Sequence, residues 1–159
     1  MNKISNEIEA IGNVYLTVLN DNGTTAKVKI KNKVLNTGVL AMVKALSNSF
    51  GGDFNLYISR MLFGTNGTSS GTPKVVEETR TGLFGTTAAA KSVVSNISVD
   101  GKRISFSATL LKTDMVGETL NKMALELADG NLFSMTTFGD ISKTNTMQLT
   151  WDWEIYIFG

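Results

Sequence analysis

Thr146-Met147-Gln148-Leu149-Thr150-Trp151-Asp152-Trp153-Glu154-Ile155-Tyr156-Ile157-Phe158 is a stretch in which two kinds of side chain alternate. Successive side chains of a β-strand point to opposite faces. One face would carry Trp151, Trp153, Ile155 and Ile157, and the other Asp152, Glu154, Tyr156 and Phe158. This alternation predicts a half-buried strand with a heavy aromatic load. The protein is therefore expected to be built around a β-sheet.

Two further alternating stretches lie earlier in the sequence. Residues 11–20 and residues 26–31 both alternate apolar with polar side chains, as strands do. Between them lies Asn20-Asp21-Asn22-Gly23, whose residue types tolerate the positive φ that a tight turn demands. The sequence predicts a β-hairpin here.

Between residues 37 and 49 the apolar spacing becomes that of a helix. Asn36 or Thr37 can cap its start, and Gly51-Gly52 can end it. Because a lone amphipathic helix of this length is marginal in water, its apolar stripe is expected to lie against a sheet. The residues of that stripe are Val39, Leu40, Met42, Val43 and Leu46.

The remaining patterns are strands, hairpins and one long loop. Alternation predicts a strand over residues 55–63, and hairpins that pair 92–100 with 102–113 and 120–127 with 131–138. Residues 64–85 show little periodicity and predict a long loop, which in a compact domain is usually functional or ordered by a partner. The loop is too polar and glycine-rich to build a core of its own, so we expect other subunits to order it.

Together these patterns predict a mostly β fold of about eight short strands with one α-helix. We expect a β-sandwich or a jelly-roll-like barrel. The alternative is an open α+β sheet with the helix covering one face. Residues 1–10 would form an N-terminal arm and residues 11–159 a single domain.

Composition narrows the functional classes. Fifteen basic and fourteen acidic residues leave a formal charge of +1, which argues against nucleic acid as a partner. No apolar run is long enough to predict a membrane span, and the first ten residues do not resemble a secretory signal. Without cysteine or histidine, the chain can form neither a thiolate or histidine metal site nor a Ser-His-Asp triad. We expect a non-enzymatic protein that needs no cofactor or metal.

Three groups of side chains suggest alternatives. Asp152 and Glu154 would share a strand face and could serve acid–base catalysis, although such pairs more often form a solvated or interface face. Trp151 and Trp153 could stack on sugars, although core packing is their more usual role. A basic stripe would either block unwanted β-pairing at a sheet edge or meet an acidic partner. The stripe consists of Lys27, Lys29, Lys31 and Lys33.

Two segments resemble small virion proteins of tailed bacteriophages. The first is the strand at residues 58–63, followed by Gly64-Thr65-Asn66-Gly67-Thr68 and later by Glu78-Thr79-Arg80-Thr81-Gly82-Leu83-Phe84. The second joins Met123-Ala124-Leu125-Glu126-Leu127-Ala128-Asp129-Gly130-Asn131-Leu132-Phe133-Ser134 to Phe138-x-x-Ile141-x-Lys143 and Leu149-x-Trp151-x-Trp153-x-Ile155. The resemblance covers residues 38–158. The chain departs from the family in Gly-Thr-Asn-Gly-Thr, where Gly-Thr-Gly-Thr is commoner.

The resemblance implies a structural subunit of the phage tail, fibre, collar or head decoration, made in the host bacterial cytoplasm and located in the virion. It brings no catalytic residues. Its partners would be other virion proteins and other copies of the chain, as a trimer or hexamer. A receptor- or carbohydrate-binding module that recognises a host surface glycan is the alternative, and a carboxylate-dependent hydrolase is the less favoured one. Besides the arm, the expected interface residues are Thr65, Asn66, Thr68, Ser69, Ser70, Thr72, Pro73, Lys74, Arg80, Tyr156 and Phe158.

Overall fold

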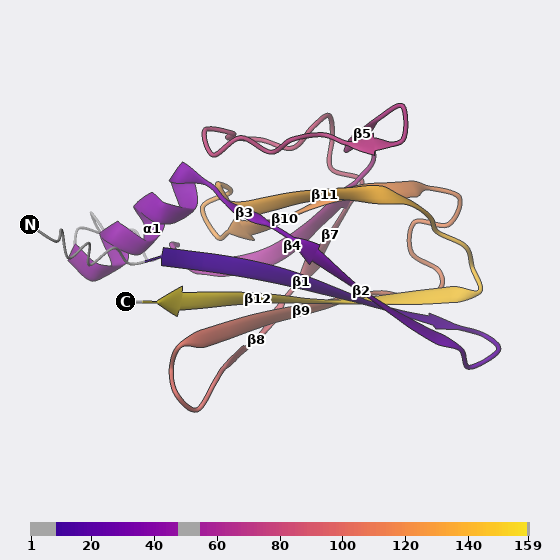
Figure 1. The fold of residues 1–159 in the computed structure, drawn as a ribbon, viewed down its shortest axis with the longest axis horizontal. Coiled ribbons are helices and arrows are strands. Elements are labelled where there is room, and N and C mark those ends of the chain that lie inside the picture. The colour runs from indigo at the N-terminus through magenta and orange to yellow at the C-terminus, as the bar shows by residue number, and fades with distance from the viewer. Residues whose placement is uncertain (1–8, 48–54, 159) are drawn as a thin grey trace, which may run out of the picture.

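Two antiparallel β-sheets pack face to face in this protein (Figure 1). The structure is a computed structural model that describes residues 9–47 and 55–158. Sheet A contains, in spatial order, β2 (Thr25–Lys31), β1 (Glu9–Asn20), β12 (Met147–Phe158), β9 (Arg103–Leu110) and β8 (Val94–Ile97). Sheet B contains β3 (Lys33–Val34), β11 (Leu132–Ser142), β10 (Thr119–Leu127), β4 (Ile58–Gly64) and β7 (Ala89–Ser92).

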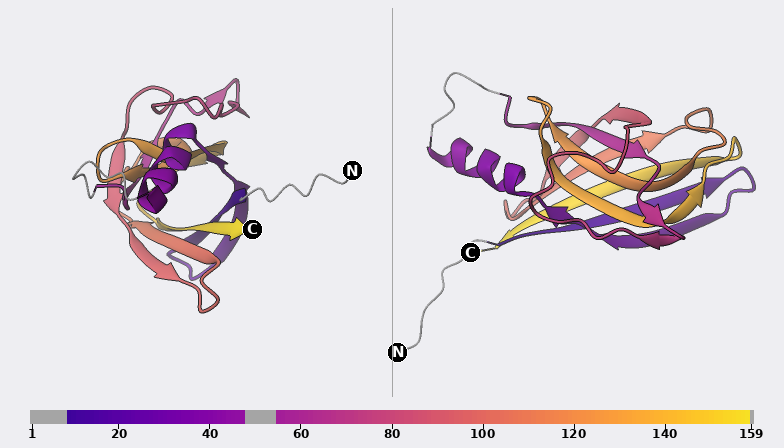
Figure 2. Two further views of the ribbon diagram at one scale, coloured as in Figure 1. Left: turned by 90° about the vertical axis from the view of Figure 1, so that its left-hand side faces the viewer. Right: turned by 90° about the horizontal axis from the view of Figure 1, so that it is seen from above.

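The sheets are also joined at both edges. Asn32 is the single residue between β2 and β3, and Val93 is the single residue between β7 and β8. At each edge the chain therefore runs from one sheet into the other, while the two sheets keep separate hydrogen-bond ladders (Figure 2). The strand predicted over residues 92–100 is shorter, because β8 covers only Val94–Ile97 and Ser92 is the last residue of β7 in the other sheet.

This arrangement confirms the prediction of a mostly β sandwich with one helix, for the part of the chain that the structure describes. The open α+β sheet is wrong, because a second sheet rather than the helix covers sheet A. The three predicted hairpins are present as β1–β2, β8–β9 and β10–β11. Each turn contains a glycine in the left-handed region, where a side chain would be strained. These are Gly23, Gly101 and Gly130, with φ of 77°, 69° and 90°.

The core between the sheets is centred on the tryptophans of β12. Trp151 and Trp153 are fully buried. The ring of Trp151 lies 5.8 Å from that of Phe63 on β4 and 5.2 Å from that of Phe138 on β11, measured between centroids. The predicted inward face of β12 is thus confirmed, except that Ile157 at the end of the strand is 43% exposed.

Helix α1 (Asn36–Ser47) lies at one end of the sandwich (Figure 1) and packs on β11 through its smallest residues. Gly38 has no room for a side chain, because a Cβ there would lie 2.2 Å from the carbonyl oxygen of Phe133. Ala41 is buried. Met42 is partly buried against the core. The other larger apolar residues point away from β11, and the exposed fractions are 46% for Val39, 50% for Leu40, 54% for Val43 and 83% for Leu46.

The expectation that the apolar stripe of the helix lies against a sheet is therefore confirmed for Met42 alone and is wrong for the other four residues of the stripe. Close approach to β11 requires the small residues Gly38 and Ala41, which turns the large ones outward. The predicted end of the helix at Gly51-Gly52 lies outside the described residues, as do residues 1–8 of the predicted arm. Glu9 and Ala10 belong to β1.

Candidate functional site

Residues 64–85, the predicted long loop, cover the outer face of sheet B. Val76, Leu83 and Phe84 of the loop pack on a second apolar cluster, on the side of the sheet away from the tryptophans. The loop also contains a small hairpin of β5 (Thr68–Ser69) and β6 (Thr72–Pro73), which the sequence pattern did not predict. The cluster consists of Leu35, Leu62, Ala124, Leu132 and Met135.

Polar contacts fix the start of the loop to sheet B. The amide of Gly67 donates to Oδ1 of the buried Asn121 at 2.6 Å. Asn121 Nδ2 and the hydroxyl of Thr68 both donate to Oδ1 of Asp140, at 2.9 and 3.0 Å. The loop adds none of the buried residues of the second apolar cluster, so sheet B supplies the core that the loop cannot build for itself. The prediction that other subunits order the loop therefore loses its physical reason.

Lys122 of β10 is fully buried beneath the far end of the loop. Its ammonium donates to the carbonyl oxygen of Phe84 and, at 2.8 Å, to that of Thr86. Burial lowers the pKa of Lys122 below its usual value, and the nearby charges of Lys74 and Arg80 lower it further. A buried cation therefore ties the loop to the sheet.

Replacing Gly67 by alanine is expected to destabilise the protein by about 1–3 kcal/mol, the usual cost of inserting a side chain where none fits. The added Cβ would lie 2.1 Å from the backbone carbonyl oxygen of Asn121, so the loop would have to shift. Gly82→Ala is the matched control, because a Cβ there meets no described atom within 4 Å. Urea unfolding measures both variants, and equal midpoints would contradict the expectation.

The predicted interface residues do not form one surface. Within the loop, side chains are either exposed or engaged with the protein itself. Tyr156 lies on sheet A, on the other layer of the sandwich. Phe158 belongs to β12, and its side chain lies outside the described part. The exposed loop residues are Asn66, Ser69, Ser70, Thr72 and Pro73, and the partly buried ones are Thr65, Thr68, Lys74 and Arg80.

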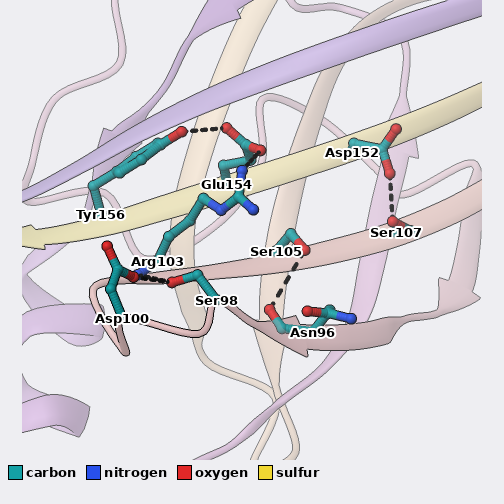
Figure 3. Close-up of polar contacts among 9 residues, drawn as sticks. All are labelled: Asn96, Ser98, Asp100, Arg103, Ser105, Ser107, Asp152, Glu154 and Tyr156. Carbon is teal, nitrogen blue, oxygen red and sulfur yellow. Dashed lines mark hydrogen bonds and ion pairs between the residues drawn. The ribbon is translucent and has the colours of Figure 1, made fainter.

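The outer face of sheet A carries a network of polar side chains (Figure 3). Glu154 accepts hydrogen bonds from the guanidinium of Arg103 at 2.8 Å and from the hydroxyl of Tyr156 at 2.7 Å. Asp152 accepts one from the hydroxyl of Ser107. The bond to Glu154 raises the pKa of Tyr156, since the hydroxyl would lose its proton beside a carboxylate.

This network borders a shallow groove of about 460 Å³, which Tyr15 and Lys27 line on the other side. Sequence reasoning could not place Arg103 beside Glu154, because that requires the register between β9 and β12. Since both carboxylates already accept hydrogen bonds, the arrangement does not favour a free acid–base pair for hydrolysis.

The positions of the residues bear on two other sequence-based alternatives. Trp151 and Trp153 are core residues, so neither can stack on a sugar. Lys27, Lys29 and Lys31 are exposed on β2 at an edge of sheet A, as expected for lysines that block β-pairing. Lys33 lies on sheet B instead and forms an ion pair with Glu78 at 2.5 Å.

The largest feature that sequence reasoning missed is the exposed apolar end of the sandwich. Val39, Val43 and Leu46 share one face of α1, because residues three and four apart are neighbours on a helix. Val39, Ile11 of β1 and Ile157 of β12 line a hollow of about 430 Å³ beside the helix. We call Ile11, Val39, Val43, Leu46 and Ile157 the α1 surface. The signal that could have revealed it is the small pair Gly38 and Ala41, which marks the buried side of the helix.

Comparisons with protein-family models, with curated proteins and with solved structures found no match for the chain. Among the described residues, no helix is both long enough and apolar enough to span a bilayer. The function must therefore be inferred from the surfaces of the protein itself.

Proposed function

We propose that the protein is a structural subunit that binds copies of itself and other proteins in a tailed-bacteriophage particle. The α1 surface is the observation that carries the assembly role. The resemblance of residues 58–84 and 123–155 to small virion proteins supports the assignment to a phage particle. No catalytic residue is assigned.

The α1 surface is suited to binding protein because it is apolar and contiguous with a hollow. Val43 is 54% and Leu46 is 83% exposed, so both keep most of their contact area for a partner. Full burial of one such side chain contributes about 1.5–3 kcal/mol. Exposed apolar patches of this kind mark protein interaction sites. Lys44 is the only charged residue of α1, which leaves this side of the helix without electrostatic protection against association.

The test is the mass of the protein in solution, measured by light scattering over a range of concentrations. We expect the unmodified protein to form oligomers and Val43→Glu to shift it towards monomer, because a charge would have to be buried in the contact. Val75→Glu is the matched control, since Val75 is 76% exposed in the loop and is not one of the residues of the α1 surface.

Equal masses for V43E and V75E would contradict assembly through the α1 surface, as would an unmodified protein that stays monomeric at every concentration. The assignment to a phage particle is tested by labelling the protein in purified phage particles. A label absent from head, neck and tail would overturn that part of the proposal.

A further inference from the structure

Strand β8 is an edge of sheet A whose second side has no strand partner among the described residues. It pairs with β9 alone, from Val94↔Ser107 to Ile97↔Ile104. All four of its residues are exposed, Val94 by 75% and Ile97 by 67%. An exposed edge presents unpaired N–H and C=O groups to which another strand can add.

The two outer strands of sheet A differ in how they are protected against such pairing. β2 carries Lys27, Lys29 and Lys31, which oppose the addition of a strand. On the other edge, the chain from Ser92 to Val99 contains no charged residue and no proline. No bulge interrupts the register of β8 with β9 either. The β2 edge therefore carries charges that oppose the addition of a strand, whereas the β8 edge carries none.

The hydrogen bonds of β8 indicate which of its backbone groups are available. The amide of Ser98 donates to the carbonyl oxygen of Arg103 at 2.8 Å, so Ser98 directs its backbone groups towards β9. These groups alternate in direction along an antiparallel strand. Asn96 therefore also faces β9, whereas Ser95 and Ile97 direct their N–H and C=O groups away from the sheet.

We propose that β8 pairs antiparallel with β8 of a second copy, about a two-fold axis at Asn96, so that two A sheets join into one. Ser95 of each copy then exchanges hydrogen bonds with Ile97 of the other. Other registers are less suitable, because the amide of Val93 already donates to Ser59 at 3.3 Å and Val99 lies in the turn. Asn96 faces Asn96 as a non-hydrogen-bonded pair.

A second copy fits this edge because the register is complementary to itself. The uncharged strand meets an uncharged strand, and Ser95 and Ile97 supply all the outward backbone groups of β8. This inference deepens the proposed self-assembly and rests on it, but uses a surface separate from the α1 surface.

A cysteine at the axis tests the register. Because the sequence has no cysteine, Asn96→Cys gives one thiol per copy, and any disulfide must join two copies. Opposed Cα atoms of a non-hydrogen-bonded pair lie about 4.5 Å apart, inside the range of about 4.4–6.8 Å for a disulfide. We expect most of the oxidised N96C protein to migrate as a covalent dimer in a non-reducing gel.

Val94→Cys is the matched control, because Val94 is exposed on the same face of β8. The proposed axis would separate two Val94 residues by the rise of four residues, about 13 Å, which is too far for a disulfide. Adding Ile97→Lys to N96C is expected to abolish the cross-link, since lysine guards a strand edge. Equal cross-linking of N96C and V94C, or none in either, overturns the pairing.

The outcomes separate this inference from the proposed function. If N96C fails to cross-link while V43E still lowers the mass in solution, the β8 pairing falls and assembly through the α1 surface stands. If N96C cross-links but V43E matches V75E, the pairing stands and the α1 surface loses its role. An unmodified protein that is monomeric throughout, together with no cross-link in N96C, overturns both.

Discussion

Replacing Trp151 by alanine is expected to lower the free energy of unfolding by about 3–5 kcal/mol, the range for removing a buried tryptophan. This is a large part of the roughly 5–15 kcal/mol that stabilises an ordinary domain. Trp151 is fully buried on sheet A and contacts Phe63 and Phe138 on two different strands of sheet B. A cavity at this position would leave both sheets underpacked. To fill the cavity, one whole sheet would have to shift towards the other.

Urea unfolding followed by circular dichroism measures the effect of W151A. Trp153 is the one other tryptophan, so its fluorescence reports independently on the same core. Val99→Ala serves as the control, because Val99 is fully exposed in the β8–β9 turn and such changes usually stay within about 0.5 kcal/mol. Similar unfolding midpoints for W151A and V99A would show that Trp151 does not hold the two sheets together.

The second large effect is expected at Lys122 and depends on pH. Its pKa in the folded protein lies below the ordinary lysine value of 10.5, because the ammonium is buried. Between the folded pKa and 10.5, the folded protein binds fewer protons than the unfolded chain, so the free energy of unfolding rises with pH. Below the folded pKa both states keep the proton, and the penalty of burying the charge is fully present.

Lys122→Met isolates this contribution, since methionine is a long, uncharged side chain that can occupy the same space. The free energy of unfolding of the unmodified protein, relative to K122M, is expected to increase from pH 7 to pH 10. Lys143 is also buried and has a pKa lowered by burial, but it is present in both proteins and cancels in the difference. Parallel stability curves for the two proteins would contradict the assignment.

Local signals account for the parts of the fold that could be predicted. The alternation around Trp151 and Trp153 fixes which face of β12 is buried, whatever strands lie opposite. The turns at Gly23 and Gly130 define hairpins without reference to distant residues. The helix shows the limit of such patterns. Its apolar spacing indicates which face favours burial, but it does not indicate which part of the protein that face packs against. There, Gly38 and Ala41 decide the packing through steric contact with β11.

The parts that could not be predicted depend on contacts between distant segments. Leu83 and Phe84 pack on sheet B from a loop without periodicity, so composition alone suggested a loop with no core. Lys122 reads as an ordinary exposed strand residue until the loop covers it. The ion pair of Arg103 with Glu154 likewise appears only once β9 and β12 are aligned. Each of these requires strand order and register, which one sequence does not specify.

The pairing of β1 with β12 has a consequence for how the protein is made. These strands pair along 12 residues, from Glu9↔Phe158 to Asn20↔Met147. The middle of sheet A cannot form until the chain has been synthesised through β12, and pairings between such distant segments form slowly. Until then the β1–β2 hairpin exposes Val14 and Leu16, which are buried in the finished fold. A nascent chain that contains β1 and β2 but not yet β12 is therefore prone to aggregate through these two core residues.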